Sequence, residues 1–127
     1  MPFNLNRVEL IGRLGHDPDT RFTSDGQAIT RFSLATDRPA RSDEEPVTDW
    51  HQIVCWRKLA ELAGQYLGKG RLVFVAGRLT YRSWEDREGQ RRRATEIIAT
   101  ELIPLDRRPE AAAGEQPAEA ADDELPF

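Results

Sequence analysis

The feature that most restricts the fold is a series of alternating stretches with a single helical stretch among them. Apolar and polar residues alternate over 8–14, 28–37, 49–56, 71–84 and 91–105. This two-residue period is typical of strands that bury one face. Over 58–67 the apolar residues fall at helical spacing instead, and Gly68 and Gly70 then favour a helix end. The order predicts an all-β, five-stranded OB-fold barrel with one α-helix between strands 3 and 4.

Polar segments separate the predicted strands. Residues 15–22, GHDPDTRF, break the alternation with glycine and proline, and the Asp25-Gly26 pair after them is a strong hairpin signal. Residues 38–46, RPARSDEEP, are polar and contain two prolines, so they are predicted to form a loop. Residues 85–90, EDREGQ, supply a turn before the last strand.

The end of the chain differs in composition from the rest. Residues 1–108 contain 18 lysines and arginines against 16 acids, whereas 109–127 contain six acids and no basic residue. The terminal stretch also lacks an apolar period and bulky residues to bury. We therefore predict one domain over 1–108, a disordered linker over 109–121 and an acidic partner-binding tip over 122–127.

The composition predicts a cytoplasmic protein without a metal or cofactor. Cys55 is the one cysteine, so an internal disulfide is impossible, and its apolar surroundings favour a buried core thiol. No apolar stretch approaches the roughly 20 residues that span a bilayer, and the first ten residues lack the apolar block of a secretion signal. The two histidines do not stand at metal-ligand spacing.

Strand parity gathers tryptophans and arginines on one face of two predicted strands. Successive side chains of a strand point to opposite sides, so residues two apart share a face. The opposite face of both strands is aliphatic and supplies the barrel core. The residues that share the aromatic face are Trp50, Gln52, Val54 and Trp56 in the third strand and Phe74, Arg78, Arg82 and Trp84 in the fourth.

Flat rings between cations suit unpaired nucleic acid, whose bases expose faces to stack and whose phosphates need neutralising. Sixteen of the 18 basic residues are arginine, which forks onto phosphate and also lies flat on a base. Two alternatives stay open. The arginine content can reflect a genome whose composition favours arginine codons, and the tryptophans can pack in the core or at a subunit contact. The candidate DNA-binding residues are Trp50, Trp56, Trp84 and Phe74 for the bases and Arg13, Arg31, Arg78, Arg82 and Arg91 for the phosphates.

Three internal stretches and the terminal hexapeptide carry a resemblance to a known family. They read NRVELIGRLGHDPDTRF, TDWHQIVCWRKLAELAGQYLGKG, GRLTYRSWEDREGQRR and DDELPF. They resemble the bacterial single-stranded DNA-binding proteins from about Asn6 to Leu105 and again at the tip. The resemblance implies a non-enzymatic OB-fold homotetramer that coats single-stranded DNA without sequence preference. It further implies action in DNA replication, recombination, repair and the SOS response, at the nucleoid.

The resemblance also assigns individual positions. The family's stacking aromatics fall on Trp50, Trp56 and Trp84, and His51 falls near a subunit contact of the family. The family often has a further aromatic near Ala40, in the loop 38–46, where this chain has none. The stacking contribution of that loop is therefore in doubt.

The terminal hexapeptide is predicted to recruit other genome-maintenance proteins. The resemblance implies that the final phenylalanine enters an apolar pocket while the terminal carboxylate and the acids meet basic residues. Apolar anchors with limited entropy and steering acids are consistent with that role. Competition with DNA for the chain's own basic face, and a merely solubilising tail, are the alternatives. The residues concerned are Asp122, Asp123, Glu124, Leu125, Pro126 and Phe127.

Two other functions stay open on the residues alone. Glu85, Asp86 and Glu88 cluster at a predicted turn and are the candidate ligands of a nuclease metal, although a charged hairpin tip is the commoner explanation. The second open function is that of a primosome-type OB subunit, which binds proteins first and DNA second. We predict that the chain is not an enzyme.

Overall fold

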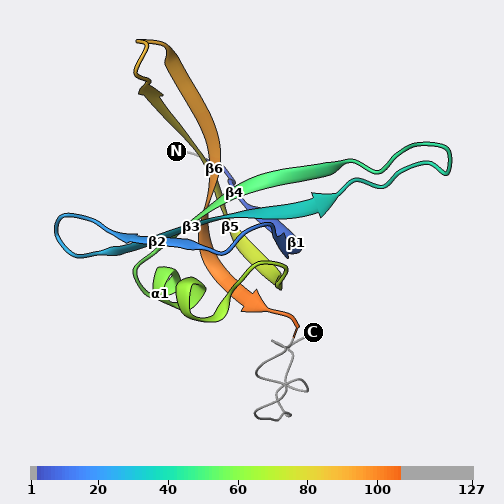
Figure 1. The fold of residues 1–127 in the computed structure, drawn as a ribbon, viewed down its shortest axis with the longest axis horizontal. Coiled ribbons are helices and arrows are strands. Elements are labelled where there is room, and N and C mark those ends of the chain that lie inside the picture. Colours follow the sequence, from blue (N-terminus) through green and yellow to red (C-terminus); the bar gives the residue numbers. More distant parts are fainter. Residues whose placement is uncertain (1–2, 107–127) are drawn as a thin grey trace, which may run out of the picture.

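The computed structural model describes residues 3–106, which form six strands and one helix. The strands are β1 (Val8–Leu14), β2 (Asp19–Phe22), β3 (Ala28–Asp37), β4 (Thr48–Trp56), β5 (Leu72–Glu85) and β6 (Arg91–Pro104). The helix α1 (Arg57–Tyr66) lies between β4 and β5 in the chain. The strands form one sheet in the order β1-β5-β6-β4-β3-β2, and β1 also pairs with β3, which closes the barrel (Figure 1). The predicted OB-fold is confirmed.

The sequence pattern predicts a break over 15–22, where the structure has the short strand β2. Its four residues are all exposed, so they carry no apolar alternation from which a strand can be predicted. Pairing with β3 over the whole of β2 makes it a strand. The predicted hairpin turn joins the two, with Thr23 N–H donating to the Gln27 carbonyl over 2.9 Å and Gly26 at a φ of 90°, which favours glycine.

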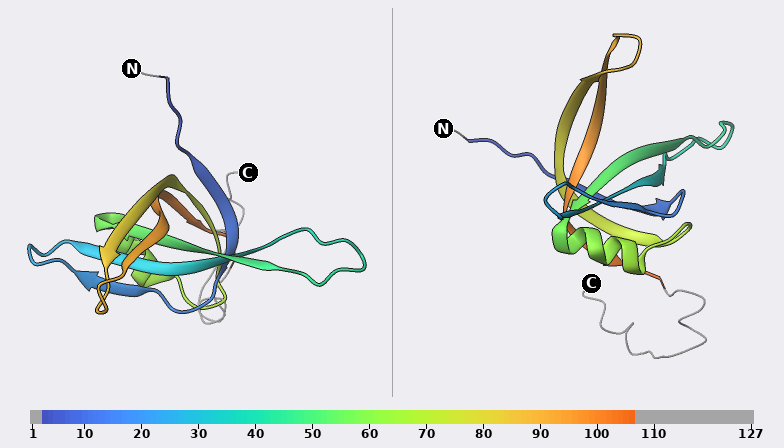
Figure 2. Two further views of the ribbon diagram at one scale, coloured as in Figure 1. Left: turned by 90° about the horizontal axis from the view of Figure 1, so that it is seen from above. Right: turned by 60° about the vertical axis from the view of Figure 1, so that its left-hand side comes forward.

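The core residues come from the inner faces of the strands and from α1, which lies beside the barrel (Figure 2). Ile53 and Cys55 of β4 and Val73 and Val75 of β5 are fully buried, so the aliphatic faces predicted from parity do form the core. Ala60 and Ala63 are the buried residues through which α1 packs against the barrel. Within residues 3–106 no helix is long and apolar enough to cross a membrane.

Burial of Cys55 removes its reactivity. Desolvation raises the pKa of the Cys55 thiol to about 12, because a thiolate is disfavoured away from water. The predicted buried thiol is confirmed.

A β-bulge lets β6 keep apolar residues in the core on both sides of Thr100. Gly77 of β5 pairs with Ala99, and the preceding Ala76 pairs with Glu101, so β6 carries one extra residue at this point. The extra residue reverses the parity of β6. Ala99 and Leu102 therefore both face the core although they are three positions apart.

Two hairpin arms project from the barrel in different directions (Figure 1). The β3–β4 arm continues past the last ladder pair, with Arg38 N–H donating to the Val47 carbonyl over 2.9 Å. Its exposed tip is the predicted loop 38–46. The β5–β6 arm ends in a turn closed by the Asp86 N–H, which donates to the Gln90 carbonyl over 2.9 Å.

Candidate nucleic-acid interface

Two tryptophans of β4 lie on the outer face of the barrel. Trp50 pairs with Ala35 of β3, and Trp56 pairs with Ile29. Trp50 is 54% exposed and Trp56 is 36% exposed, although Ile53 between them is fully buried. The six-residue separation along the strand corresponds to about 20 Å. The rings are therefore open to solvent at two separate positions of one face.

The ring of Trp50 rests on Gly15. A Cβ atom at position 15 would lie 2.4 Å from Cζ3 of the ring, which is too close for any side chain. The glycine therefore lets the six-membered ring of the indole pack closely against the backbone after β1. One side of the ring is supported, and more than half of the side chain remains exposed.

Trp56 stands at the point where β4 becomes α1. Its backbone is extended, with φ −121° and ψ 147°, and it occupies the N-cap of the helix. The following Arg57 has a φ of 57°, a left-handed conformation that costs a non-glycine residue about 1 kcal/mol. This abrupt turn lets the chain enter α1 while Trp56 keeps its place in the strand.

Trp84 lies on the β5–β6 arm with an arginine on its ring. The guanidinium carbon of Arg82 is 4.4 Å from the ring centroid, a cation–π contact worth about 0.5–1 kcal/mol at an exposed site. Trp84 is 37% exposed. Because Arg82 occupies one face of the indole, the other face is the one that a base can stack on.

A buried carboxylate connects Arg82 to the barrel. Oε2 of Glu96 accepts hydrogen bonds from Nε of Arg82 over 3.1 Å and from Nη1 of Arg31 over 2.9 Å. Glu96 is 6% exposed. Its neighbour across the parallel β4–β6 ladder is Gln52, which lies between the two tryptophans of β4. This cluster was missed in the sequence analysis.

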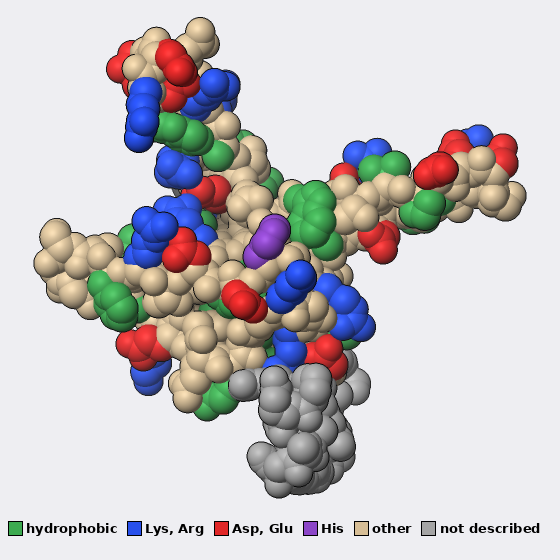
Figure 3. Space-filling view, viewed as in Figure 1, with side chains coloured by type: hydrophobic (Ala, Val, Ile, Leu, Met, Phe, Trp, Pro, Cys, Tyr) green, Lys and Arg blue, Asp and Glu red, His purple; other side chains and the backbone are tan. Residues whose placement is uncertain are grey.

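The ladders place the predicted arginines at different distances from the tryptophans. Arg31 pairs with Val54, so it shares the outer face with Trp56. Arg78 is exposed and pairs with Ile98 on the same face as Arg82. Basic side chains gather along the β5–β6 arm down to its base, with hydrophobic side chains between them (Figure 3).

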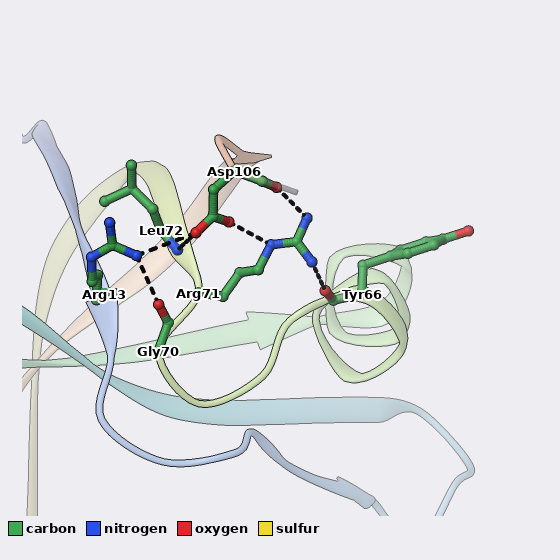
Figure 4. A network of polar contacts seen from close by, with 6 residues as sticks. All are labelled: Arg13, Tyr66, Gly70, Arg71, Leu72 and Asp106. Atoms are coloured by element: carbon green, nitrogen blue, oxygen red, sulfur yellow. Dashed lines mark hydrogen bonds and ion pairs between the residues drawn. The ribbon is translucent and has the colours of Figure 1, made fainter. Parts of the chain in front are cut away.

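Arg13 pairs with Ala35, the ladder partner of Trp50, but its guanidinium belongs to a polar cluster where β6 ends (Figure 4). Nη1 of Arg13 donates to Oδ2 of Asp106 over 3.2 Å and to the Gly70 carbonyl over 2.9 Å. Arg71 donates from Nε to Oδ1 of the same carboxylate over 2.7 Å. The cluster ties β1 and the start of β5 to the end of β6, and Arg13 is one of its members.

Phe74 is distant from Trp84. It is half-buried and pairs with Ile11 of β1 and Ile103 of β6. Parity placed it on the same side of β5 as Trp84, but ten residues separate the two, which is about 33 Å along a strand. Phe74 therefore belongs to an apolar patch at the other end of the sheet, where Ile11 is 55% exposed.

The register of the β5–β6 arm decides which arginine of 91–93 accompanies Trp84. Trp84 pairs directly with Arg92, whereas Arg91 pairs with Glu85 and lies on the opposite side of the arm. Nε of Arg92 also donates to Oδ2 of Asp86 over 2.8 Å. The turn 86–90 fixes this register, and counting back from that turn was the available signal for Arg92.

The acids of the same turn have a structural use. Oδ1 of Asp86 accepts from the N–H groups of Glu88 and Gln90 over 3.0 and 2.8 Å. The hydrogen bond from Gln90, followed by that from Arg92, lowers the pKa of this carboxyl. Over the described part of the chain, no group of three or more acids, histidines or cysteines is placed to hold a metal ion.

The other predicted positions are His51 and the tail. His51 is half-buried, and its Nε2 lies 2.8 Å from Oγ1 of Thr36. The predicted linker 109–121 and tip 122–127 lie outside the described residues.

Comparison with known proteins shows the family to which this chain belongs. A family model described as the single-strand binding protein family matches residues 5–105. The chain belongs to this family. Its members are DNA-binding proteins rather than enzymes, which agrees with the prediction that the chain is not an enzyme.

Individual relatives in the family are similar over most of the chain. The Single-stranded DNA-binding protein 1 of Chlorobaculum tepidum is 45% identical over 83% of this chain and 67% of its own length. The Single-stranded DNA-binding protein of Neisseria meningitidis serogroup A is 45% identical over 87% of this chain and 66% of its own length. The chain thus spans about two thirds of these relatives. A solved structure, the SSB of Plasmodium falciparum in complex with single-stranded DNA, has a TM-score of 0.77 and 38% identity, covering 84% of this chain and 99% of that chain.

Proposed function

We propose that the chain binds single-stranded DNA without sequence preference. The observation that carries the proposal is the exposure of Trp50, Trp56 and Trp84 on one side of the sheet, among arginines. Each stacked base contributes about 1–3 kcal/mol on such rings, whatever the base, since every base has a π-face. Duplex DNA keeps these faces inside its own stack and is therefore bound less tightly.

The phosphate contacts come from arginines beside the rings. Arg31, Arg78 and Arg82 share the face with the tryptophans, and the register adds Arg92. A guanidinium presents several donors in a fixed plane and grips phosphate oxygens in pairs. Three other residues were expected to contact DNA: Arg13, whose guanidinium is bound to Asp106; Phe74, at the far end of β5 from Trp84; and Arg91, on the opposite side of the β5–β6 arm. The proposal does not rest on them.

The direct test is a fluorescence titration. Adding oligothymidine should quench the tryptophan emission, and the log of affinity should fall with log salt by about 0.7 per neutralised phosphate. A duplex of equal length, tested at the same salt, should bind far more weakly. Equal binding of the duplex, or an unchanged emission at saturation, contradicts the proposal. Incubating labelled single strands with magnesium or manganese should leave their length unchanged.

In the cell we propose that the chain protects single strands during DNA replication, recombination and repair, including the SOS response, at the nucleoid. The tip 122–127 would recruit other genome-maintenance proteins through its apolar end and its acids. Affinity capture with the whole chain and with a chain ending at 121 tests this role. Equal capture of replication and repair proteins by both would contradict it.

We further propose that copies of the chain assemble, as a homotetramer. Strand β1 pairs with β5 over 8–13, but its other edge meets β3 only at Arg13 and Leu14. An open edge of this kind is suited to pairing with another strand. The exposed Ile11 and the apolar patch around Phe74 lie on the same strands. Sedimentation with and without oligothymidine measures the assembly, and a monomer under both conditions contradicts it.

A further inference from the structure

The Glu96 carboxylate stands out because it is buried in the middle of a face proposed to meet a polyanion. A carboxylate removed from water is costly unless it is paired, and one oxygen of Glu96 serves two guanidinium groups, at 2.9 and 3.1 Å. The three residues come from β3, β5 and β6. The side chains of Arg31 and Arg82 stay about half exposed.

Each arginine keeps donors for a second partner. Arg82 uses Nε for Glu96, which leaves its two terminal amino groups while the plane lies against Trp84. Arg31 uses one terminal amino group. Arg31 also lines a surface pocket of about 220 Å³ together with Asp19, Arg21 and Ile29. Ile29 is the ladder partner of Trp56, so the pocket lies beside that ring.

We propose that Glu96 is a positioning residue of the interface, which holds Arg82 on Trp84 and Arg31 beside Trp56 and limits their combined charge to one. This inference rests on the proposed binding of single-stranded DNA. One carboxylate neutralises one of the two guanidinium groups, so the cluster neutralises about one phosphate rather than two. The remaining donors are held in fixed planes, which lowers the entropy lost when a phosphate binds.

Glu96 thereby sets the geometry of stacking as well as the charge. With Arg82 fixed under one face of Trp84, a base is directed to the opposite face. The same carboxylate fixes Arg31 near Trp56, so one group orders a phosphate contact near each of two tryptophans. The negative charge of Glu96 lowers the affinity for DNA, whereas its positioning of the two arginines raises it. Substitutions of Glu96 can separate these two effects.

The first test is Glu96→Gln, which keeps the size of the side chain and removes its charge. Oligothymidine binding is measured from low to high salt. We expect the slope of log affinity against log salt to steepen by about 0.7, since one more phosphate is neutralised. Over a tenfold rise in salt, the affinity of Glu96→Gln should then fall about fivefold more than that of the unaltered chain. Glu101→Gln makes the same charge change farther along β6 and should leave the slope unchanged.

The second test is Glu96→Asp, which keeps the charge and shortens the reach. The slope should stay as in the unaltered chain, while the affinity falls at every salt concentration. The emission of the DNA-free protein should also change, because Arg82 leaves the Trp84 ring. Adding Trp84→Phe to both proteins should abolish this difference in emission. A role confined to stabilising the fold predicts none of these changes in slope or emission once the variants are confirmed as folded.

The outcomes separate this inference from the proposed function. If the unaltered chain does not bind oligothymidine, the proposed function fails. If it binds, and Glu96→Gln has the slope of Glu101→Gln, the inference is overturned and the function stands. Should Glu96→Gln not fold, Glu96→Asp decides, since unchanged affinity and unchanged emission of Trp84 overturn the inference equally.

Discussion

The β5–β6 arm and the β3–β4 arm are both antiparallel hairpins that leave the same barrel, yet their side chains differ (Figure 1). The first carries Trp84 next to Arg82, and its turn region 86–93 has four arginines against two acids. The tip of the second, 38–46, has two arginines against three acids and no aromatic residue. The projection of an arm therefore does not by itself mark it as part of the proposed interface, whereas exposed rings and cations on its surface do.

The largest effect is expected at Trp84. Replacing Trp84 with alanine removes one stacking surface, worth about 1–3 kcal/mol, or about 5- to 150-fold in affinity. Oligothymidine titration of the folded variant measures the loss. Tyr81→Ala is the matched control, because Tyr81 is an exposed aromatic on the other side of the same strand. Equal losses in both variants would break the comparison, since the arm as a whole would then matter rather than one face.

A smaller effect of opposite sign is expected from giving the second arm a ring. Ala40→Trp adds a stacking surface to the loop 38–46, and the affinity should rise by about fivefold, the lower end for one stacked base. The added tryptophan should itself be quenched by oligothymidine. Ala40→Leu adds apolar bulk without a π-face and should leave the affinity unchanged. A gain with leucine equal to that with tryptophan would show that stacking is not the cause.

The register of the first arm predicts a difference between neighbouring arginines. Arg92→Gln should lower the salt dependence by about 0.7, since Arg92 accompanies Trp84. Arg91→Gln should leave it unchanged, because Arg91 lies on the opposite side of the arm. Titrations at several salt concentrations measure both slopes. The reverse order would place the DNA on the other face of the β5–β6 arm.

The smallest effect is expected when the pH is lowered, and it concerns the stability of both arms. The pKa of Asp86 is lowered chiefly by the Gln90 N–H, and that of Asp49 chiefly by a hydrogen bond from Arg38. A carboxyl with a lowered folded pKa stabilises the fold above its unfolded pKa of about 3.9, and this stabilisation is lost as pH falls through the folded value. The protection of the Gln90 amide against exchange, relative to its intrinsic rate at each pH, should therefore be lost at acid pH before that of the core. In Asp86→Asn this acid-dependent step should vanish, and its persistence would assign it to another group.

Local patterns predicted the outward tryptophans correctly, whereas the tertiary structure decided the position along a strand and the remote partners. Trp50 and Trp56 were placed because a two-residue period holds within any strand. Phe74 has the correct parity but lies at the far end of β5, and parity carries no information on length. Arg13 contacts Asp106, 93 residues away, and no local pattern indicates such a partner.

The sequence by itself determined the strands with an apolar face, the single helix, the hairpin turns and the outward tryptophans. These depend on neighbours within a few residues, because side-chain period and turn conformation are local properties. The tertiary structure decided which strands lie side by side. The parallel pairing of β4 with β6 sets Glu96 beside Gln52, and the pairing of β3 with the other edge of β4 brings Arg31, 65 residues earlier in the chain, within 2.9 Å of Glu96. Pairing between strands far apart in the sequence depends on long-range contacts, so the Glu96 cluster forms only when β3, β4, β6 and β5 lie side by side.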